Sequence, residues 1–260
     1  MRLILFKRKP GKLENEILSL IDEAARLIKQ SKYVVAFTGA GMSVDSGLPL
    51  YNHWNNFDPH ILDINYFRQN PAEVWQEFKK SFLTIYPQAK PNRAHLLLKE
   101  MQDQRLIRGI ISVNIDDLHQ KAGSTNVHNV CGQINGSVCQ NCAHKFNIQE
   151  ISFEHLPPTC SECGGILKPD ILFWGDLVPD PEYKLGMKEA NRAKLMIIIG
   201  TSGTIMPAGV IPMFAKYRRH VSIIEINIQP TVYTSQITDI FIPLPAAEAL
   251  SLLKQHLLEG

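Results

Sequence analysis

The chain has 260 residues, 45% of them hydrophobic, which is enough to bury one large core with a small appended module. Its 27 basic and 25 acidic residues leave a formal net charge of +2, so the composition gives no case for nucleic acid as an obligatory partner. No apolar run approaches the ~20 residues of a membrane span, and the N-terminal apolar run is too short for a signal peptide. We therefore expect a cytoplasmic protein without a membrane partner.

Helical and strand patterns alternate along the chain. Residues 13–29 place their apolar side chains on one helical face. Residues 33–37 form a short β-branched run that leads into a glycine turn. Three similar runs follow, at residues 109–113, 195–199 and 221–226. Further helical patterns lie at residues 91–101, 205–217 and 246–258. Nearly continuous apolar runs are typical of strands in a parallel sheet that helices cover on both faces, so we expect an α/β fold.

Two segments interrupt this alternation. Residues 50–88 are rich in aromatic side chains and helical in pattern, and we expect them to pack over the sheet beside a cleft, with most of the aromatics in a core. Residues 137–167 are polar and irregular and could not build a core alone. We interpret both segments as insertions into the α/β domain.

The second insertion contains a cysteine pattern, C-x2-C-x17-C-x2-C. Its members are Cys139, Cys142, Cys160 and Cys163. Two thiolate pairs at this spacing can close a tetrahedral zinc site, with each pair in one tight turn. Four protein ligands leave no open coordination position, so such a zinc ion would hold structure and perform no chemistry.

The glycine turn after the first predicted strand favours a phosphate or dinucleotide site. Gly39-Ala40-Gly41 would let backbone amides approach a pyrophosphate. The pattern departs from the dehydrogenase fingerprint, because the third glycine comes late, at Gly47, and no clear acidic residue follows a second strand about twenty residues on. A nucleotide at this turn is therefore expected, whereas hydride transfer is disfavoured.

Several motifs, in order and spacing, resemble those of the sirtuins, the NAD-dependent protein deacylases. They are residues 39–49 (GAGMSVDSGLP), Pro91-Asn92 with Ala94-His95, Asn114-Ile115-Asp116 with Leu118-His119 and Ala122-Gly123, the four cysteines, Lys168-Pro169-Asp170 through Phe173-Trp174-Gly175-Asp176, Gly200-Thr201-Ser202 with Pro207-Ala208, and Ile226-Asn227. The resemblance covers roughly residues 30–245.

The resemblance implies a Rossmann-like NAD-binding domain and an inserted zinc ribbon. It places the NAD-binding domain at residues 1–49, 89–136 and 168–260, a helical insertion or cofactor-binding loop at 50–88, and the zinc-ribbon module at 137–167. It also implies NAD and a structural zinc ion as cofactors, and a protein or peptide substrate as partner.

The resemblance also implies roles for individual residues. The catalytic set is Asn114, Asp116 and Cys131. The cofactor-binding set is Gly39, Ala40, Gly41, Ser43, Asn114, Asp116, Gly200, Thr201, Ser202 and Asn227. The segment Phe173, Trp174 and Gly175 would bind substrate. Asn114 and Asp116 would order the ribose, a water and the nicotinamide amide, while Ser202 and Asn227 would hold the phosphates and the adenosine ribose.

The chain departs from the family pattern at three positions. Tyr51-Asn52 replaces a phenylalanine-arginine pair, so a cation near the cofactor is missing. Val113 replaces a glutamine before the catalytic asparagine and cannot hydrogen-bond a ribose. Cys131 stands where the family has its general-base histidine, and His128 lies three residues too early to replace it unless the loop is rebuilt.

Cysteine at the base position has three readings: a buried inert thiol, a thiolate acting as a weak base, or a nucleophile that traps ADP-ribose. Histidine would be the better base near neutral pH in each case, so slow deacylation is expected. The functional alternatives are therefore a weak deacylase, a protein ADP-ribosyltransferase or NAD hydrolase, and a non-catalytic NAD-binding module. Phe78 and Ser81 stand where one sirtuin class binds acidic acyl chains, and neither can pair with a carboxylate.

Overall fold

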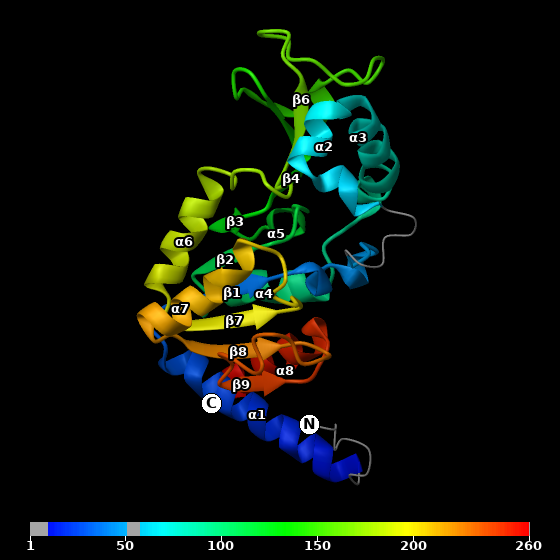
Figure 1. Cartoon of the computed structure of the whole chain (residues 1–260). Coiled ribbons are helices and arrows are strands. Elements are labelled where there is room, and N and C mark those ends of the chain that lie inside the picture. The colour runs from blue at the N-terminus through cyan, green and yellow to red at the C-terminus, as the bar shows by residue number, and fades with distance from the viewer. Residues whose placement is uncertain (1–9, 51–57, 260) are drawn as a thin grey trace.

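The fold centres on one parallel sheet. The computed structural model describes residues 10–50 and 58–259. The six strands are, in spatial order, β3 (Val127–Asn129), β2 (Gly109–Ser112), β1 (Val34–Thr38), β7 (Leu195–Ile199), β8 (Ser222–Ile226) and β9 (Ile240–Ile242), and every neighbouring pair is parallel (Figure 1). The four strands predicted from apolar runs are confirmed within one residue at each end.

The strand order reverses between β1 and β7. From β1 the chain continues to β2 and β3 on one side, whereas β7, β8 and β9 extend the sheet on the other side. Phe37 of β1 is in register with Ile111 of β2 and with Ile198 of β7. In open α/β sheets ligands bind at such a reversal, beyond the carboxyl ends of the strands.

Helices cover both faces of the sheet, as predicted from the strand composition. One face carries α1 (Pro10–Gln30), α4 (Arg93–Asp103) and α8 (Ala246–Glu259). The other carries α6 (Glu182–Arg192) and α7 (Ile211–Arg219). Successive strand residues enter opposite cores, since Ala36 packs with the first group and Val35 and Phe37 pack with the second. This double burial explains why the strands are apolar without alternation.

The two insertions form one further unit with a shared core. The helical part contains α2 (Ile64–Gln69), α3 (Pro71–Phe78) and a π-helical turn at Lys79–Leu83. The other part is an antiparallel sheet in the order β5 (Lys145–Asn147), β4 (Gly132–Cys139) and β6 (Leu167–Ile171). Trp75 is fully buried between them and donates from Nε1 to the Leu167 carbonyl at 2.7 Å.

The sequence patterns missed several short or irregular elements. They are β3, β9, α6 and the one-turn helix α5 (Leu118–Lys121). β3 is three residues long and contains polar His128 and Asn129, and α6 contains Gly186, where a Cβ atom would lie 2.6 Å from Val130 Cγ1. Trp54 and Phe57 of the aromatic segment lie outside the described residues. The boundaries expected between the NAD-binding domain and the two insertions stay a prediction.

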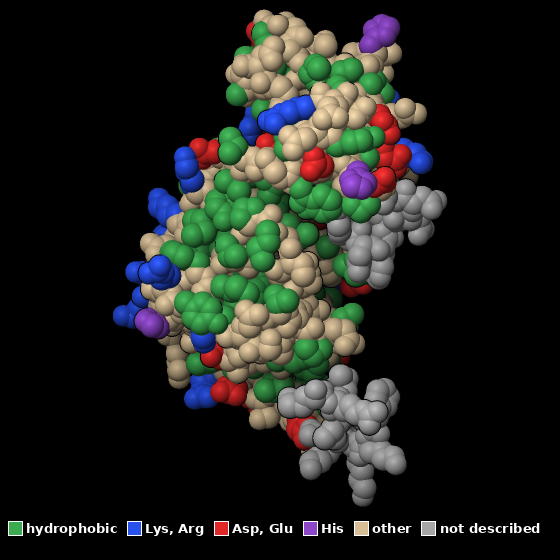
Figure 2. Space-filling model, in the orientation of Figure 1, with side chains coloured by type: hydrophobic (Ala, Val, Ile, Leu, Met, Phe, Trp, Pro, Cys, Tyr) green, Lys and Arg blue, Asp and Glu red, His purple; other side chains and the backbone are tan. Residues whose placement is uncertain are grey.

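The helix predicted at 205–217 is shorter than expected. A 3-10 turn at Ala208–Val210 precedes α7, which begins at Ile211 with a proline in its first turn. Figure 2 shows hydrophobic side chains gathered on the surface over α6 and α7, with lysines and arginines along the edge. Met206, Val210 and Tyr217 contribute exposed apolar side chains, so part of the apolar pattern at 205–217 faces outward.

The described part of the chain contains no helix both long and apolar enough to cross a membrane.

Candidate active site

Two turns pack backbone against backbone at the carboxyl ends of β1 and β7. Gly39 N donates to Ile199 O at 3.0 Å, and Gly41 N donates to Gly200 O at 2.8 Å. A Cβ atom on Gly39 would lie 2.4 Å from Thr201 Cβ, and one on Gly41 would lie 2.8 Å from Gly200 Cα. Glycine is therefore required at both positions. This pair of turns, the glycine cradle, lies at the reversal of strand order, where open α/β sheets bind the phosphates of dinucleotides.

A buried polar cluster adjoins the glycine turn. Asn114 Nδ2 donates to Gly39 O at 3.1 Å and to Ser43 Oγ at 3.2 Å, and Ser43 Oγ donates to Asp116 Oδ2 at 2.9 Å. Ser43 is 1% exposed, and Asn114 and Asp116 are each 6% exposed. Burial raises the pKa of Asp116, while hydrogen bonds from Leu118 N and Ser43 oppose that rise. The structure thus brings together three of the residues expected at the site.

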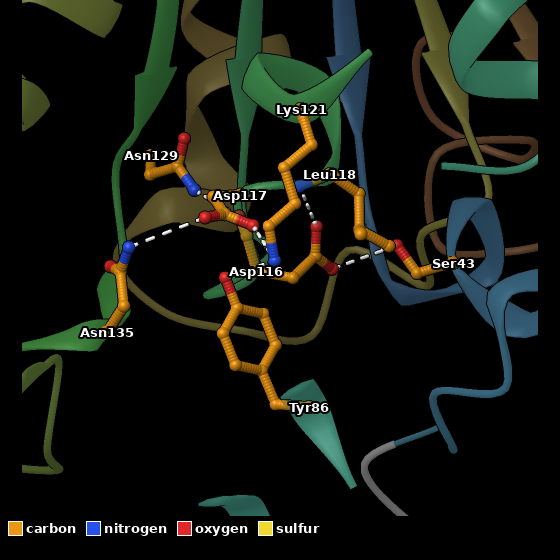
Figure 3. Close-up of polar contacts among 8 residues, drawn as sticks. All are labelled: Ser43, Tyr86, Asp116, Asp117, Leu118, Lys121, Asn129 and Asn135. Atoms are coloured by element: carbon orange, nitrogen blue, oxygen red, sulfur yellow. Dashed lines mark hydrogen bonds and ion pairs between the residues drawn. The ribbon is translucent and has the colours of Figure 1, made fainter. Parts of the chain in front are cut away.

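The loop that carries Asp116 is held from two sides (Figure 3). From β3, Asn129 Nδ2 donates to Asn114 O at 3.2 Å and to Asp116 O at 2.7 Å. On the other side, Lys121 pairs with Asp117 at 2.9 Å and donates to Tyr86 Oη at 3.2 Å. These contacts were not predicted, because Asn129 and Tyr86 belong to no sequence motif and reach the loop only in the folded chain.

The second turn and the end of β8 supply the remaining cofactor candidates. Thr201 is 7% exposed and accepts a hydrogen bond at its carbonyl from Asn227 Nδ2 at 3.1 Å. The Ser202 hydroxyl is exposed and lies 2.9 Å from Thr204 Oγ1. Ala40 begins the 3-10 turn Ala40–Met42 that follows Gly39. All of these residues lie at the same edge of the sheet as Asn114, although their roles stay a prediction.

Cys131 is a buried neutral thiol. Its side chain packs into the core beneath α6 and α7 and is 4% exposed. Burial raises its pKa to about 12, so the thiol keeps its proton at neutral pH. This environment disfavours both the weak-base and the nucleophile readings, since each requires a thiolate.

His128, the alternative candidate for the base, lies on β3. Its Nδ1 lies 3.1 Å from Glu182 Oε2 on α6, and its Nε2 lies 3.0 Å from Asn126 Oδ1. Both ring nitrogens are therefore engaged at the α6 side of β3. Val113, the other described departure, follows β2 and packs against the same core as Cys131. Tyr51 and Asn52 lie outside the described residues.

The predicted substrate segment follows β6. Trp174 N donates to Leu62 O at 2.7 Å, and Ile64 N donates to Trp174 O at 3.0 Å, so the segment runs alongside the start of α2. The Trp174 side chain is 49% exposed, whereas Phe173 is 1% exposed. Gly175 has a φ of 77°, which allows the chain to turn away. Of these three residues, Trp174 is the one whose side chain is exposed at the surface.

The side chain of Lys168 is buried against this segment. Its side chain is 5% exposed, its Nζ pairs with Asp176 Oδ2 at 3.0 Å, and it lies 4.2 Å from the centre of the Phe173 ring. Burial lowers the pKa of Lys168, and Asp176 opposes that shift.

The two positions that bear on acidic acyl chains are Phe78 and Ser81. Phe78 is fully buried, and the Ser81 hydroxyl donates to Glu77 Oε1 at 2.6 Å. Neither side chain offers a cation for an acidic acyl group.

The four cysteines form a compact cluster. Cys139 Sγ lies 3.5 Å from Cys163 Sγ, Cys142 Sγ lies 3.7 Å from Cys160 Sγ, and all four sulfur atoms lie within 4.8 Å of one another. Zinc–sulfur bonds of about 2.3 Å require tetrahedral sulfur atoms about 3.8 Å apart. The donor set and its spacing therefore fit a structural zinc ion. Cys131 does not belong to this cluster.

Two buried histidines lie near the loop that carries Asp116. The rings of His95 and His119 are 4.9 Å apart, and His119 Nε2 is hydrogen-bonded to Thr38 Oγ1 at 2.9 Å. Burial lowers the pKa of His95 to about 4, and burial followed by the charge of His95 lowers that of His119 to about 3. Both rings are therefore neutral at physiological pH.

We predict that zinc removal destabilises the unit built from the insertions, because zinc binding contributes directly to the folding of such modules. Cys142→Ser should abolish the binding of about one zinc ion per chain and lower the unfolding temperature, as measured by elemental analysis and calorimetry. Cys131→Ser is the matched control and should keep its zinc. Retention of zinc by the Cys142→Ser protein would contradict the assignment.

We also predict that the histidine pair makes stability depend on pH. The unfolded chain binds protons near pH 6.5, whereas the folded pKa values are about 4 and about 3. The free energy of unfolding should therefore fall as pH drops from about 7 to about 5, by about 1–2 kcal/mol for each histidine. Urea unfolding of the wild type and of His119→Gln measures this slope, which should be smaller in the variant. Identical slopes in the two proteins would rule out this linkage.

Comparisons with known proteins agree with the geometry of the site. The sequence profile of the Sir2 family matches residues 39–207. An NAD-dependent protein deacylase of Aeropyrum pernix is 36% identical over 231 residues, which is 87% of this chain and 93% of that protein. NAD-dependent protein deacetylase 1 of Pyrobaculum aerophilum is 38% identical over 219 residues, which is 82% of this chain and 85% of that protein.

Solved structures give the same result. A complex of a Sir2 homologue with NAD has a TM-score of 0.82 and 32% identity, and the match covers 92% of this chain and 94% of that one. A Sir2 protein bound to acetylated peptide has a TM-score of 0.81 and 28% identity, and the match covers 90% of this chain and 98% of that one. Sequence and fold therefore agree over most of the molecule, and the chain belongs to the Sir2 family, the sirtuins.

Proposed function

We propose that this chain is an NAD-dependent protein-lysine deacylase whose deacylation is slowed by the cysteine at the general-base position. The observation that carries the proposal is the buried Asn114–Ser43–Asp116 cluster beside the glycine cradle, at the reversal of strand order. Family membership and relatives described as deacylases, or as bound to NAD and to acetylated peptide, support it.

Bound NAD would supply the ADP-ribosyl group, with nicotinamide as leaving group and the acyl oxygen of lysine as the attacking atom. The chain's own residues prepare this chemistry by position. Gly39, Gly41 and Gly200 would hold the pyrophosphate, while Asn114 and Asp116 would orient the ribose and nicotinamide from buried positions beside them. Trp174, exposed beside the start of α2, would contact the peptide.

Proton transfer is the weak part of this site. Removing a proton from a ribose hydroxyl requires a basic group, and the Cys131 thiol, with a pKa of about 12, is protonated at neutral pH. Loss of nicotinamide does not require that base. We therefore expect the steps that depend on Asn114 and Asp116 to proceed and the base-dependent step to limit deacylation.

The neutral Cys131 also favours a second candidate function. If the ADP-ribosyl group is not passed on by the base-dependent route, it is available to a protein acceptor or to water. ADP-ribosyl transfer to protein and NAD hydrolysis are therefore the alternatives to deacylation, and a non-catalytic NAD-binding module remains the third candidate because of Val113 and Cys131.

We further propose that the protein works in the cytoplasm. The five cysteines are free of disulfide bonds, and four of them are gathered as thiols for a metal, which fits a reducing compartment.

The decisive experiment measures nicotinamide release from NAD by the zinc-bound protein, with and without an acetyl-lysine peptide. We expect release that depends on the peptide and yields free lysine and acylated ADP-ribose. Equal release without peptide would favour ADP-ribosyl transfer or hydrolysis. Bound NAD that stays intact for hours would leave only the binding module.

A substitution at the base position tests the role of Cys131. Cys131→His should raise the rate of peptide deacylation by about tenfold or more, because it restores a base that titrates near neutral pH. Cys131→Ser is the control, and it should show no gain. The larger ring must fit a packed core, so the unfolding temperature of each variant is measured alongside. A folded Cys131→His protein with unchanged deacylation would refute the proposed deficiency.

A further inference from the structure

Glu225 is a buried carboxylate that three threonines surround. It lies on β8 and is 0% exposed. Its oxygens accept hydrogen bonds from the hydroxyls of Thr231 at 2.6 Å, Thr234 at 2.8 Å and Thr238 at 2.6 Å. Among residues 10–50 and 58–259, no lysine, arginine or histidine forms an ion pair with it. The sequence motifs did not single out this residue.

The threonines make Glu225 the organising centre of an irregular segment, residues 228–238. Burial of an unpaired carboxylate is costly, and charge-assisted hydrogen bonds from hydroxyls offset that cost. The same hydroxyl oxygens accept backbone hydrogen bonds, since Thr231 N donates to Thr234 Oγ1 at 2.8 Å and Tyr233 N donates to Thr231 Oγ1 at 3.1 Å. The carboxylate thereby fixes the backbone as well as the side chains.

Tyr233 connects this segment to the chain beyond the second glycine turn. Its ring is fully buried, and its hydroxyl donates to Gly209 O at 2.8 Å. A Cβ atom on Gly203 would lie 2.7 Å from Tyr233 Cζ, so the ring is in close contact with the backbone that directly follows Gly200–Ser202. The ring also meets Phe37 of β1 edge to face, with centres 6.5 Å apart.

Glu225 is also close to the turn along its own strand. Asn227, two residues further on, donates from Nδ2 to Thr201 O at 3.1 Å. The turn at 200–202 is therefore held both by Asn227 at the end of β8 and by the Tyr233 segment that Glu225 organises.

We propose that Glu225 is a positioning residue for the nucleotide: acting through its threonines and Tyr233, it sets the position of the Gly200–Ser202 turn and thereby the affinity for the ADP-ribose part of NAD. This inference rests on the proposed function of the site. Glu225 itself touches no expected ligand, since it is buried beneath the segment that it holds.

A second buried carboxylate provides a matched control. Glu189 on α6 is 4% exposed and accepts hydrogen bonds from the Tyr33 hydroxyl at 2.7 Å and from Arg192 at 2.9 Å. Tyr33 precedes β1, so Glu189 acts at the amino end of the sheet, opposite to the glycine turns. Substitution of either glutamate removes a buried charge, but only Glu225 contacts the segment at the nucleotide edge.

The experiment measures ADP-ribose binding to the zinc-bound full chain by titration calorimetry, together with the unfolding temperature. Glu225→Gln replaces one carboxylate oxygen with an amide NH2 group, which cannot accept a hydrogen bond from a threonine hydroxyl. We expect the dissociation constant to rise about tenfold, a change of about 1.4 kcal/mol. Glu189→Gln should lower the unfolding temperature and leave ADP-ribose affinity within about twofold of the wild type, well below that tenfold change.

A milder pair of variants keeps the test usable if Glu225→Gln does not fold. Thr238→Val removes one hydroxyl donor to Glu225, whereas Thr238→Ser retains it. Weakened ADP-ribose binding in the valine variant, restored in the serine variant, supports the inference.

The outcomes separate the inference from the function on which it rests. A wild-type chain that fails to bind ADP-ribose overturns the proposed function. Wild-type binding with unchanged affinity in folded Glu225→Gln or Thr238→Val protein overturns the role of Glu225 alone, because a purely structural carboxylate would behave like Glu189.

Discussion

The contact between the turns that follow β1 and β7 is the constraint on which the site depends. Gly39 and Gly41 press against Gly200 so closely that no side chain fits at any of the three positions. Asn114 donates to the carbonyl of Gly39, and Asn227 donates to that of Thr201. These two hydrogen bonds therefore position a polar side chain on each of the two turns. The parallel sheet supplies the contact by placing β1 beside β7 at the reversal of strand order.

The site separates positioning from proton transfer. The residues expected to hold a ligand form a hydrogen-bonded cluster, Asn114–Ser43–Asp116. Burial keeps both Cys131 and His119 neutral, because it raises the pKa of the thiol and lowers the pKa of the imidazole. The residues expected to position a ligand are therefore hydrogen-bonded in place, whereas Cys131, at the expected base position, is a protonated thiol.

Local sequence patterns predicted the central strands and the cysteine cluster but not the contacts between distant segments. The central strands were predictable because burial on both faces leaves continuous apolar runs, and the cysteine cluster was predictable from spacing alone. Asn129 and Glu225 were not predictable, because their roles depend on contacts with segments that only the folded sheet brings together. The burial of Phe173 within the expected substrate segment was likewise not predictable, because a motif gives the order of residues along the chain and not which side chains are buried.

The core shared by the two insertions has a consequence for biosynthesis. The aromatic helices α2 and α3 bury Trp75 and Phe78 against β6 and β4, which follow much later in the chain. During synthesis from the N-terminus these aromatic side chains emerge without the surface that covers them, and the nearer strands β1 and β2 cannot supply it. Completion of this unit therefore waits for the second insertion and its metal, which makes zinc supply a condition for hiding an aggregation-prone surface on the nascent chain.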